Sequence, residues 1–160
     1  GFLRDLGVAA LRDRPLHALS HGQRKLVALA GVLVMQPRVV LMDEPTAGLD
    51  HAGQAAQRAV LDRLQARGHA LVISTHDLDF AAAWADEVLL LHEGRLLARG
   101  VPDAVLAQDH LLRGAGLEPP WVYAIARHLW PRESAWPRTR AQVLERLAAR
   151  KELSHAPLRV

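Results

Sequence analysis

The sequence predicts an α/β fold in which a parallel sheet is flanked by helices and followed by a short helical C-terminal extension. Two continuous apolar runs, "VVLM" at 39–42 and "ALVIS" at 70–74, are typical of strands buried on both faces of a parallel sheet. A helix predicted over about 53–67 separates them, and strands that alternate with helices indicate a parallel sheet with crossovers. Half of the 160 residues are hydrophobic, which is enough for one domain with a substantial core.

The chain ahead of the first strand is predicted to be helical. Apolar residues in the segment 1–16 predict a short helical hairpin that ends at Pro15. The stretch "LSHGQ" then begins a helix, because Ser20 and Gln23 have the spacing of a capping box. This helix stops before Pro37, since the residue that precedes a proline is pushed out of the helical region. Its apolar face is expected to comprise Leu26, Ala30, Leu33 and Val34.

After the second strand, the sequence predicts one more helix and a strand pair. The helix is expected over 77–85. The two strands are "EVLLL" at 87–91 and "RLLA" at 95–98, with Gly94 in the turn between them.

Beyond Gly100 the character of the chain changes and indicates an appended C-terminal segment. Short helical pieces are expected around 102–107 and 109–114. A last helix over about 139–151 is amphipathic. The residues expected on its inner side are Val143, Leu144 and Leu147.

Composition narrows the possible classes of function. The chain has no cysteine, so neither a disulfide framework nor a thiolate metal site is available. Its longest apolar run, at 26–35, is well short of the roughly 20 residues of a membrane helix, and no signal-peptide pattern opens the chain. The net charge is +3 and the basic residues are scattered, which argues against a nucleic-acid partner. Because the chain begins at Gly1 rather than methionine, we expect a fragment.

Two carboxylates follow the first buried strand. Asp43 and Glu44 stand at the carboxyl end of a parallel strand, where open α/β sheets place their ligands. Neighbouring strand side chains point to opposite faces, so the pair can serve one site only if the chain turns, as Pro45 allows. One carboxylate is then placed to hold Mg²⁺ through its water shell and the other to deprotonate a water. An acidic corner without a ligand explains the same residues equally well.

His76 belongs to "STHD", which follows the second strand at the same predicted sheet edge as Glu44. A histidine there can hydrogen-bond a phosphate or position a base. The alternative is a loop histidine ahead of a helix that Asp77 caps. The nine histidines show no metal-protease spacing, so a zinc site is not indicated.

Four motifs in succession, "LSHGQ", "DEP", "AGLD" and "STHD", resemble the C-terminal half of an ABC-type ATPase domain. Together with "GLEPPWVYAIARHLWP", the stretch from "LSHGQ" to "AGLD" is similar to ATPase subunits of cobalt/nickel and related energy-coupling-factor importers. The resemblance covers nearly the whole chain and is strongest from Leu16 to Gly100. It implies that residues 1–100 are the C-terminal portion of a P-loop NTPase domain, with the signature, Walker B, D-loop and H-loop motifs. Residues 101–160 are then a helical extension.

The resemblance gives the "LSHGQ" stretch a second use. Ser20, Gly22 and Gln23 would form the signature that closes on the γ-phosphate of ATP bound by the opposite subunit. A helix N-terminus offers free N–H groups and a positive dipole end to a phosphate. Capping and ATP binding in trans would therefore use the same groups.

The remaining roles transfer to residues after the first strand. Asp43 would serve Mg²⁺, and Glu44 would be the general base. Asp50 would end the loop that communicates across the dimer, and His76 would be the switch histidine near the γ-phosphate. The implied cofactors are ATP and Mg²⁺. The implied partners are a second ATPase subunit, identical or different, and transmembrane transporter subunits at the cytoplasmic face of the cell membrane.

The sequence departs from the family pattern in two ways. His21 stands where the superfamily usually has glycine, and a side chain so near the phosphate would tune affinity. Phosphate binding in such ATPases depends on a G-x-x-x-x-G-K-[ST] loop. The nearest match, Gly48 to Gly53, continues with Gln54 and Ala55 and lacks the lysine and the hydroxyl. We therefore expect a truncated product that is inactive alone.

Two other classes of protein fit part of the pattern. A soluble ABC ATPase of DNA repair or translation would share the motifs, but it is expected to carry a coiled-coil or tandem-domain insertion. A non-catalytic truncated partner would bind a complete subunit without acting itself. Intact Glu44 and His76 favour an active ancestry over this last class.

Overall fold

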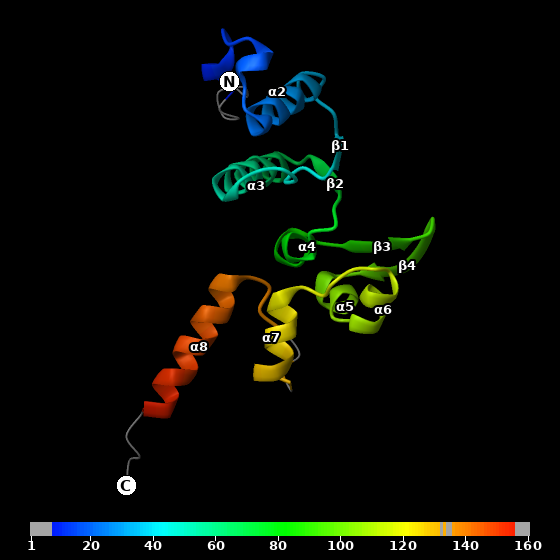
Figure 1. The fold of residues 1–160 in the computed structure, drawn as a ribbon, viewed down its shortest axis with the longest axis vertical. Coiled ribbons are helices and arrows are strands. Elements are labelled where there is room, and N and C mark those ends of the chain that lie inside the picture. The colour runs from blue at the N-terminus through cyan, green and yellow to red at the C-terminus, as the bar shows by residue number, and fades with distance from the viewer. Residues whose placement is uncertain (1–7, 132, 134–135, 156–160) are drawn as a thin grey trace. The chain divides into compact units, whose positions relative to one another are not determined.

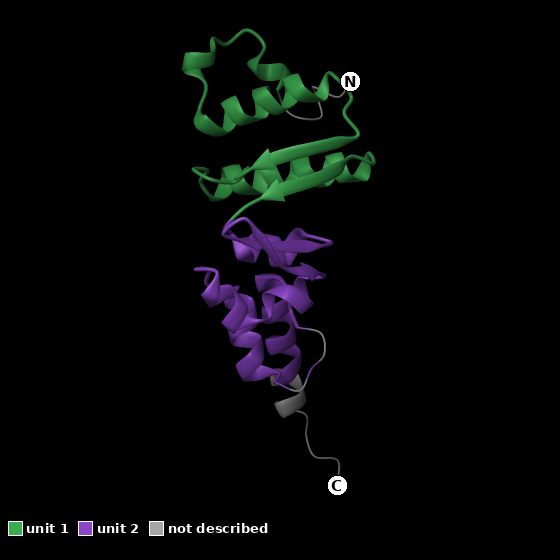
Figure 2. Cartoon of the chain, turned by 90° about the vertical axis from the view of Figure 1, so that its right-hand side faces the viewer, with its two compact units in different colours: residues 1–75 green, residues 76–160 purple. Residues whose placement is uncertain are grey.

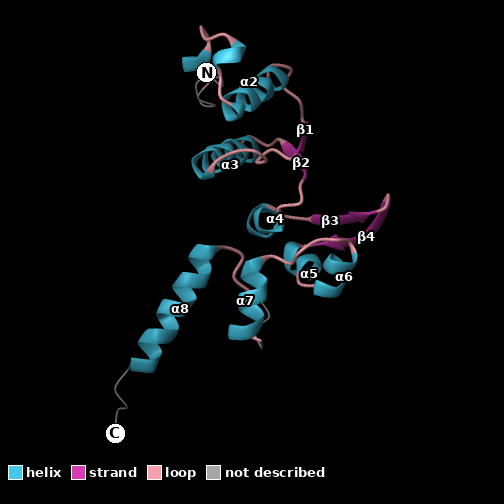
Figure 3. Ribbon diagram, in the orientation of Figure 1, coloured by secondary structure: helices cyan, strands magenta, loops and turns pink. Residues whose placement is uncertain are grey.

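The computed structural model describes residues 8–131, 133 and 136–155, with side chains up to residue 150. The chain divides into two units, Gly1–Thr75 and His76–Val160 (Figure 2). Helices and strands occur in both (Figure 3), which confirms the predicted α/β class.

The first unit starts with two turns of 3-10 helix and continues as helix, strand, helix and strand (Figure 1). Its elements are η1 (Ala9–Leu11), η2 (Leu16–Ala18), α2 (His21–Leu33), β1 (Val39–Asp43), α3 (His51–Ala66) and β2 (Ala70–Ser74). From residue 8 onward, the 3-10 turns replace the helical hairpin predicted over 1–16, and residues 1–7 lie outside the described part. Pro15 is extended, with φ −67° and ψ 145°, and keeps the two turns apart.

Helix α2 confirms the helix predicted after Ser20. Its inner face buries Leu29, Ala30 and Leu33. The expectation for Val34 is wrong: this residue is the C-terminal cap and is 70% exposed, because the helix ends there and the chain leaves towards β1.

Strands β1 and β2 pair in parallel, as predicted, and α3 is the crossover between them. The register places Val39 opposite Ala70 and Asp43 opposite Ser74. Among the described residues, only one face of this sheet is covered, so the prediction of strands buried on both faces is wrong. Burial alternates along β1, since Val40 is 3% exposed and Leu41 is 75% exposed. The covered face shares a core with α2 and α3.

The second unit consists of an antiparallel strand pair and five helices among its described residues. Its elements are α4 (Leu78–Trp84), β3 (Val88–His92), β4 (Arg95–Gly100), α5 (Pro102–Leu106), α6 (Asp109–Gly114), α7 (Trp121–Leu129) and α8 (Arg140–His155). The strand pair and the short helices match the sequence predictions. Glu93 and Gly94 form the hairpin turn with φ of 48° and 74°, the doubly left-handed geometry of a type I′ turn.

The core of the second unit lies among its helices and β3. Tyr123 of α7 and Leu112 of α6 are fully buried in it. Helix α8 contributes Val143, as expected, whereas Leu144 and Leu147 are 54% and 37% exposed, contrary to prediction. Position 144 follows 143 by one residue and therefore lies about 100° around the helix from it. No helix in the described part of the chain is long and apolar enough to cross a membrane.

Candidate functional site

The N-terminus of α2 has the predicted capping box. The Gln23 backbone N–H donates to Ser20 Oγ at 3.2 Å, and the Ser20 N–H donates to Gln23 Oε1 at 3.0 Å. The Ser20 side chain is exposed. Because the first N–H groups of a helix have no partner within that helix, this end can present donors to an anion.

The loop between β1 and α3 packs against the same end of α2. A methyl group placed on Gly48 would lie 3.5 Å from the ring of His21. One placed on Gly22 would lie 3.1 Å from Leu49 Cδ2, so only glycine fits at position 22 without displacing its neighbour. The His21 side chain thus lies beside the loop of its own chain.

Lys25, which the sequence analysis did not single out, ties this loop to α2. Its ammonium group donates to the backbone carbonyl oxygens of Glu44, Pro45 and Ala47, at 2.9, 3.3 and 2.8 Å. No local sequence pattern reveals these contacts, because they join positions about twenty residues apart.

Each carboxylate at the end of β1 accepts a hydrogen bond from a hydroxyl group at the end of β2. Ser74 Oγ donates to Asp43 Oδ1, and Thr75 Oγ1 donates to Glu44 Oε2 at 3.1 Å. The Glu44 N–H donates to the Ser74 carbonyl at 2.9 Å, which extends the ladder by one step. The chain turns at Glu44 itself, whose φ is +43°. The sequence predicted a turn at Pro45 and missed both hydroxyl partners.

The surroundings of Asp43 fit a magnesium ion held through water. Mg²⁺ keeps several waters and commonly binds through one or two carboxylates plus the phosphates of a substrate. Asp43 is exposed at the carboxyl end of β1. Within the described ranges, no cluster of three or more His, Cys, Asp or Glu side chains could form a cage made of protein ligands alone.

Asp50 is the N-terminal cap of α3. Its Oδ1 accepts the Gly53 N–H at 2.7 Å. The helix therefore begins at His51, two residues ahead of its predicted start. The communication role that the resemblance implies for Asp50 stays a prediction.

His76 is exposed and is the first residue of the second unit. The next residue, Asp77, caps α4 by accepting the Phe80 N–H at 2.9 Å. The expected place of His76 at a sheet edge shared with Glu44 stays a prediction, as does its role near a phosphate.

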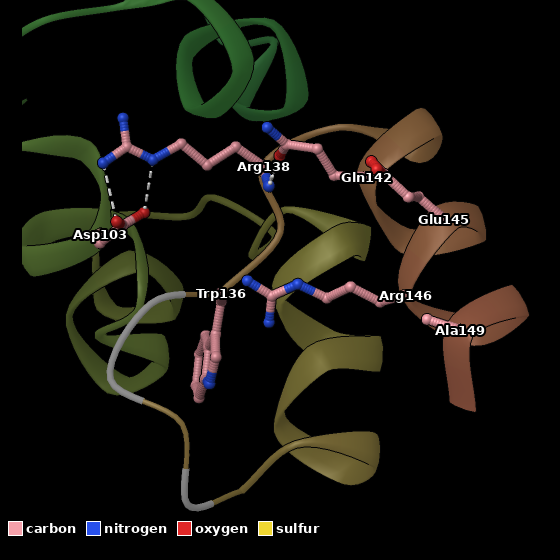
Figure 4. Close-up of a pocket in the computed structure, with 7 residues that line it drawn as sticks. All are labelled: Asp103, Trp136, Arg138, Gln142, Glu145, Arg146 and Ala149. Carbon is pink, nitrogen blue, oxygen red and sulfur yellow. Dashed lines mark hydrogen bonds and ion pairs between the residues drawn. The ribbon is translucent and has the colours of Figure 1, made fainter. Parts of the chain in front are cut away.

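A groove of about 580 Å³ lies in the second unit (Figure 4). Its lining residues are Asp103, Trp136, Arg138, Gln142, Glu145, Arg146 and Ala149. Arg138 donates twice to Asp103, at 2.9 and 2.7 Å, and Tyr123 donates to the same carboxylate. Burial acts to raise the pKa of Asp103, but the hydrogen bonds from Arg138 and Tyr123 outweigh it and lower that pKa. None of the lining residues belongs to the four motifs.

Comparison with known proteins supports the family resemblance. The ABC transporter family model matches residues 1–47. The chain is 47% identical to the cobalt import ATP-binding protein CbiO of Rhodobacter capsulatus, over 91% of this chain and 54% of that protein. It is 38% identical to the energy-coupling factor transporter ATP-binding protein EcfA2 of Methanospirillum hungatei, over 86% of this chain and 34% of that one.

Solved structures give the same picture. The structure of cbiO1 from Clostridium perfringens, described as part of the ABC transporter complex cbiONQ, has a TM-score of 0.62 and 35% sequence identity. It covers 91% of this chain and 51% of its own length. The chain thus spans about half the length of CbiO and of cbiO1.

Proposed function

Because the chain belongs to the ABC transporter family of ATP-binding proteins, we propose that it supplies the C-terminal part of an ATPase subunit that powers an importer. The observation that supports this most is the pair Asp43 and Glu44 at the end of β1, each bound by a hydroxyl from the end of β2. The names of the relatives, a cobalt import protein and an energy-coupling factor transporter protein, support an importer of this type, and we propose cobalt/nickel ions or a vitamin as its cargo.

In the proposed reaction, Glu44 accepts the proton of the water that attacks the γ-phosphate. Its Oε2 accepts the Thr75 hydroxyl at 3.1 Å, which holds the carboxylate in one orientation. Asp43 would hold Mg²⁺ through its water shell, and the ion would neutralise charge on the phosphates. His76 would hydrogen-bond the γ-phosphate as the switch residue.

Ser20, Gly22 and Gln23 would complete the site of a second ATPase subunit. The exposed Ser20 side chain and the N-terminal amides of α2 are suited to an anion that approaches from outside the chain. Asp50 would carry the signal between the two sites. The working protein is then a dimer of ATPase subunits, bound to transmembrane subunits at the cytoplasmic face of the membrane.

The chain by itself is proposed to be inactive, because its 160 residues include no G-x-x-x-x-G-K-[ST] loop. Calorimetry on the purified chain should detect no binding of Mg·ATP in the micromolar range. A chimera that places a phosphate-loop segment of an ABC ATPase ahead of residue 1 should bind and hydrolyse it. Micromolar affinity of the isolated chain for Mg·ATP would refute the proposal that a separate phosphate-loop segment is needed for binding.

The role of Glu44 is tested in the same chimera. Glu44→Gln keeps the shape and removes the basicity, so turnover should fall on the order of 10²-fold while ATP binding survives. The matched control is Glu93→Gln, which neutralises an exposed carboxylate in the β3–β4 turn and should leave turnover unchanged. Turnover near the parental rate in Glu44→Gln would move the general base elsewhere.

A further inference from the structure

We propose that Lys25 is a positioning residue that fixes the loop between β1 and α3 and couples it to the N-terminal turn of α2. Its ammonium group lies within hydrogen-bonding distance of the carbonyl oxygens of Glu44, Pro45 and Ala47. An ammonium has three N–H donors and no acceptor, so these three carbonyls satisfy all of its donors at one point.

The loop needs such a fixed point because of its backbone conformation. Glu44 has φ +43°, a left-handed conformation that is unfavourable for a residue with a side chain. Thr46 is buried, and the Ala47 N–H donates back to the Glu44 carbonyl at 3.2 Å. The cation of Lys25 stabilises this arrangement through charge-assisted hydrogen bonds, and those to the Glu44 and Pro45 carbonyls are partly buried.

Other contacts bring the same two segments together. The His21 ring lies beside Gly48, and Leu49 lies against Gly22. The hydrogen bonds of Lys25 therefore lie alongside these contacts, which join "LSHGQ" to the loop that follows Glu44. In this proposal, movement of the N-terminal part of α2 is transmitted to the backbone of Glu44 through Lys25.

This coupling rests in part on the proposed function. If Ser20 serves the ATP site of one dimer half and Glu44 serves the other, Lys25 links the two sites within one chain. The link is specific to this chain's own residues and does not depend on which ion or vitamin is transported.

Hydrogen exchange in the 160-residue chain tests the positioning role of Lys25 in the absence of ATP. Lys25→Met keeps an unbranched apolar stem of similar length and removes the ammonium group with its donors. The amides of Ala47 and Leu49, which bond to Glu44 and Thr46 carbonyls, should exchange about tenfold faster or more. Amides in the middle of α3 and in β2 should keep their exchange rates. Arg24→Met removes the neighbouring exposed cation and should leave the loop amides unchanged.

Lys25→Arg separates positioning from charge. A guanidinium keeps the charge, but its planar donors diverge and cannot meet three carbonyls at one point. In Lys25→Arg, the amides of Ala47 and Leu49 should therefore still exchange faster than in the wild type. Wild-type exchange in Lys25→Arg, unchanged exchange in Lys25→Met, or a uniform increase across the whole first unit would each overturn the proposal.

ATP turnover by the chimeric ATPase tests whether Lys25 affects catalysis. Lys25→Met should lower kcat about tenfold and leave KM for ATP unchanged, because the loop positions Glu44 whereas the phosphate-loop segment sets affinity. An unchanged kcat would overturn the coupling. A chimera that fails to hydrolyse ATP without any substitution counts against the proposed function, and the exchange rates then decide the role of Lys25 alone.

Discussion

At the residue scale, three helices of this protein begin with a side-chain cap, and each cap is at or beside a residue that is proposed to act in the ATPase. Ser20 caps α2 and Asp50 caps α3. Asp77, which follows His76, caps α4. Capping places polar side chains at the positive ends of helices, and in the proposed function the helix end at Ser20 also meets a phosphate. Capping has a local signature in the chain, which is why the sequence predicted the caps Ser20 and Asp77, whereas the helix that Asp50 caps was predicted to start two residues later than it does.

Two glycines in helices give a matched test of the capping geometry. A methyl group placed on Gly31 of α2 would meet nothing within 4 Å, so Gly31→Ala should stabilise the chain by about 0.5–1 kcal/mol. A methyl group placed on Gly53 would lie 2.9 Å from Asp50 Oδ1 and would displace the cap of α3. Gly53→Ala should therefore gain nothing or lose stability, measured by urea denaturation. Equal gains at both positions would contradict the Asp50 cap.

At the scale of elements, local sequence patterns predict the strands and turns, but they do not predict contacts between distant parts of the chain. The apolar runs correctly predicted β1 and β2, and Gly94 marked the hairpin turn. An apolar run does not reveal how many faces of its strand are covered, which is why the exposure of Leu41 was missed. The Lys25 contacts were missed for a related reason: they depend on a fold that brings distant positions together.

The contact between α5 and the segment ahead of α8 gives a pH-dependent prediction. The pKa of Asp103 is lowered in the folded chain, because the bonds from Arg138 and Tyr123 outweigh the effect of burial. A lowered folded pKa means that this stabilisation is present above the ordinary Asp pKa of about 4 and is lost as the pH falls through the folded value. Asp103→Asn should destabilise the chain by about 1–2 kcal/mol at pH 7 and by less at pH 3, which is below the ordinary Asp pKa.

Thermal denaturation at the two pH values measures this difference. The matched control is Glu118→Gln, which removes a carboxylate from an exposed ion pair with Arg113. Exposed pairs contribute little, so this control should melt like the wild type at both pH values. A gap between Asp103→Asn and wild type that is as large at pH 3 as at pH 7 would mean that the carboxylate charge is not what stabilises the contact.

At the scale of the whole molecule, each unit leaves apolar residues exposed on a sheet. In the first unit, Leu41 and Val72 lie opposite each other and are 75% and 52% exposed. In the second, Leu91 and Leu96 are paired and are 65% and 53% exposed. Apolar sheet surfaces and unpaired strand edges favour association with other chains.

The purified chain should therefore self-associate in a concentration-dependent manner. Sedimentation velocity should show less association for the double variant Leu41→Thr and Leu91→Thr, because threonine keeps the strand propensity and removes apolar surface. Leu144→Thr, which changes an exposed leucine on α8, is the control and should have a smaller effect. A chain that stays monomeric at high concentration would contradict this prediction.

In the proposed function, one chain serves two ATP sites, with Ser20 facing the partner's nucleotide and Glu44 facing its own. The most direct measurement is ATP turnover, with trapped ATP occupancy, in a mixed dimer of two chimeric subunits, one carrying Ser20→Arg and the other Glu44→Gln. In the proposed arrangement both lesions fall in one composite site and the other site is intact. The mixed dimer should then hydrolyse ATP faster than either homodimeric variant, and occupancy should differ between its two sites. Two equally damaged sites, with no recovered turnover, would contradict the claim and leave "LSHGQ" as a helix start alone.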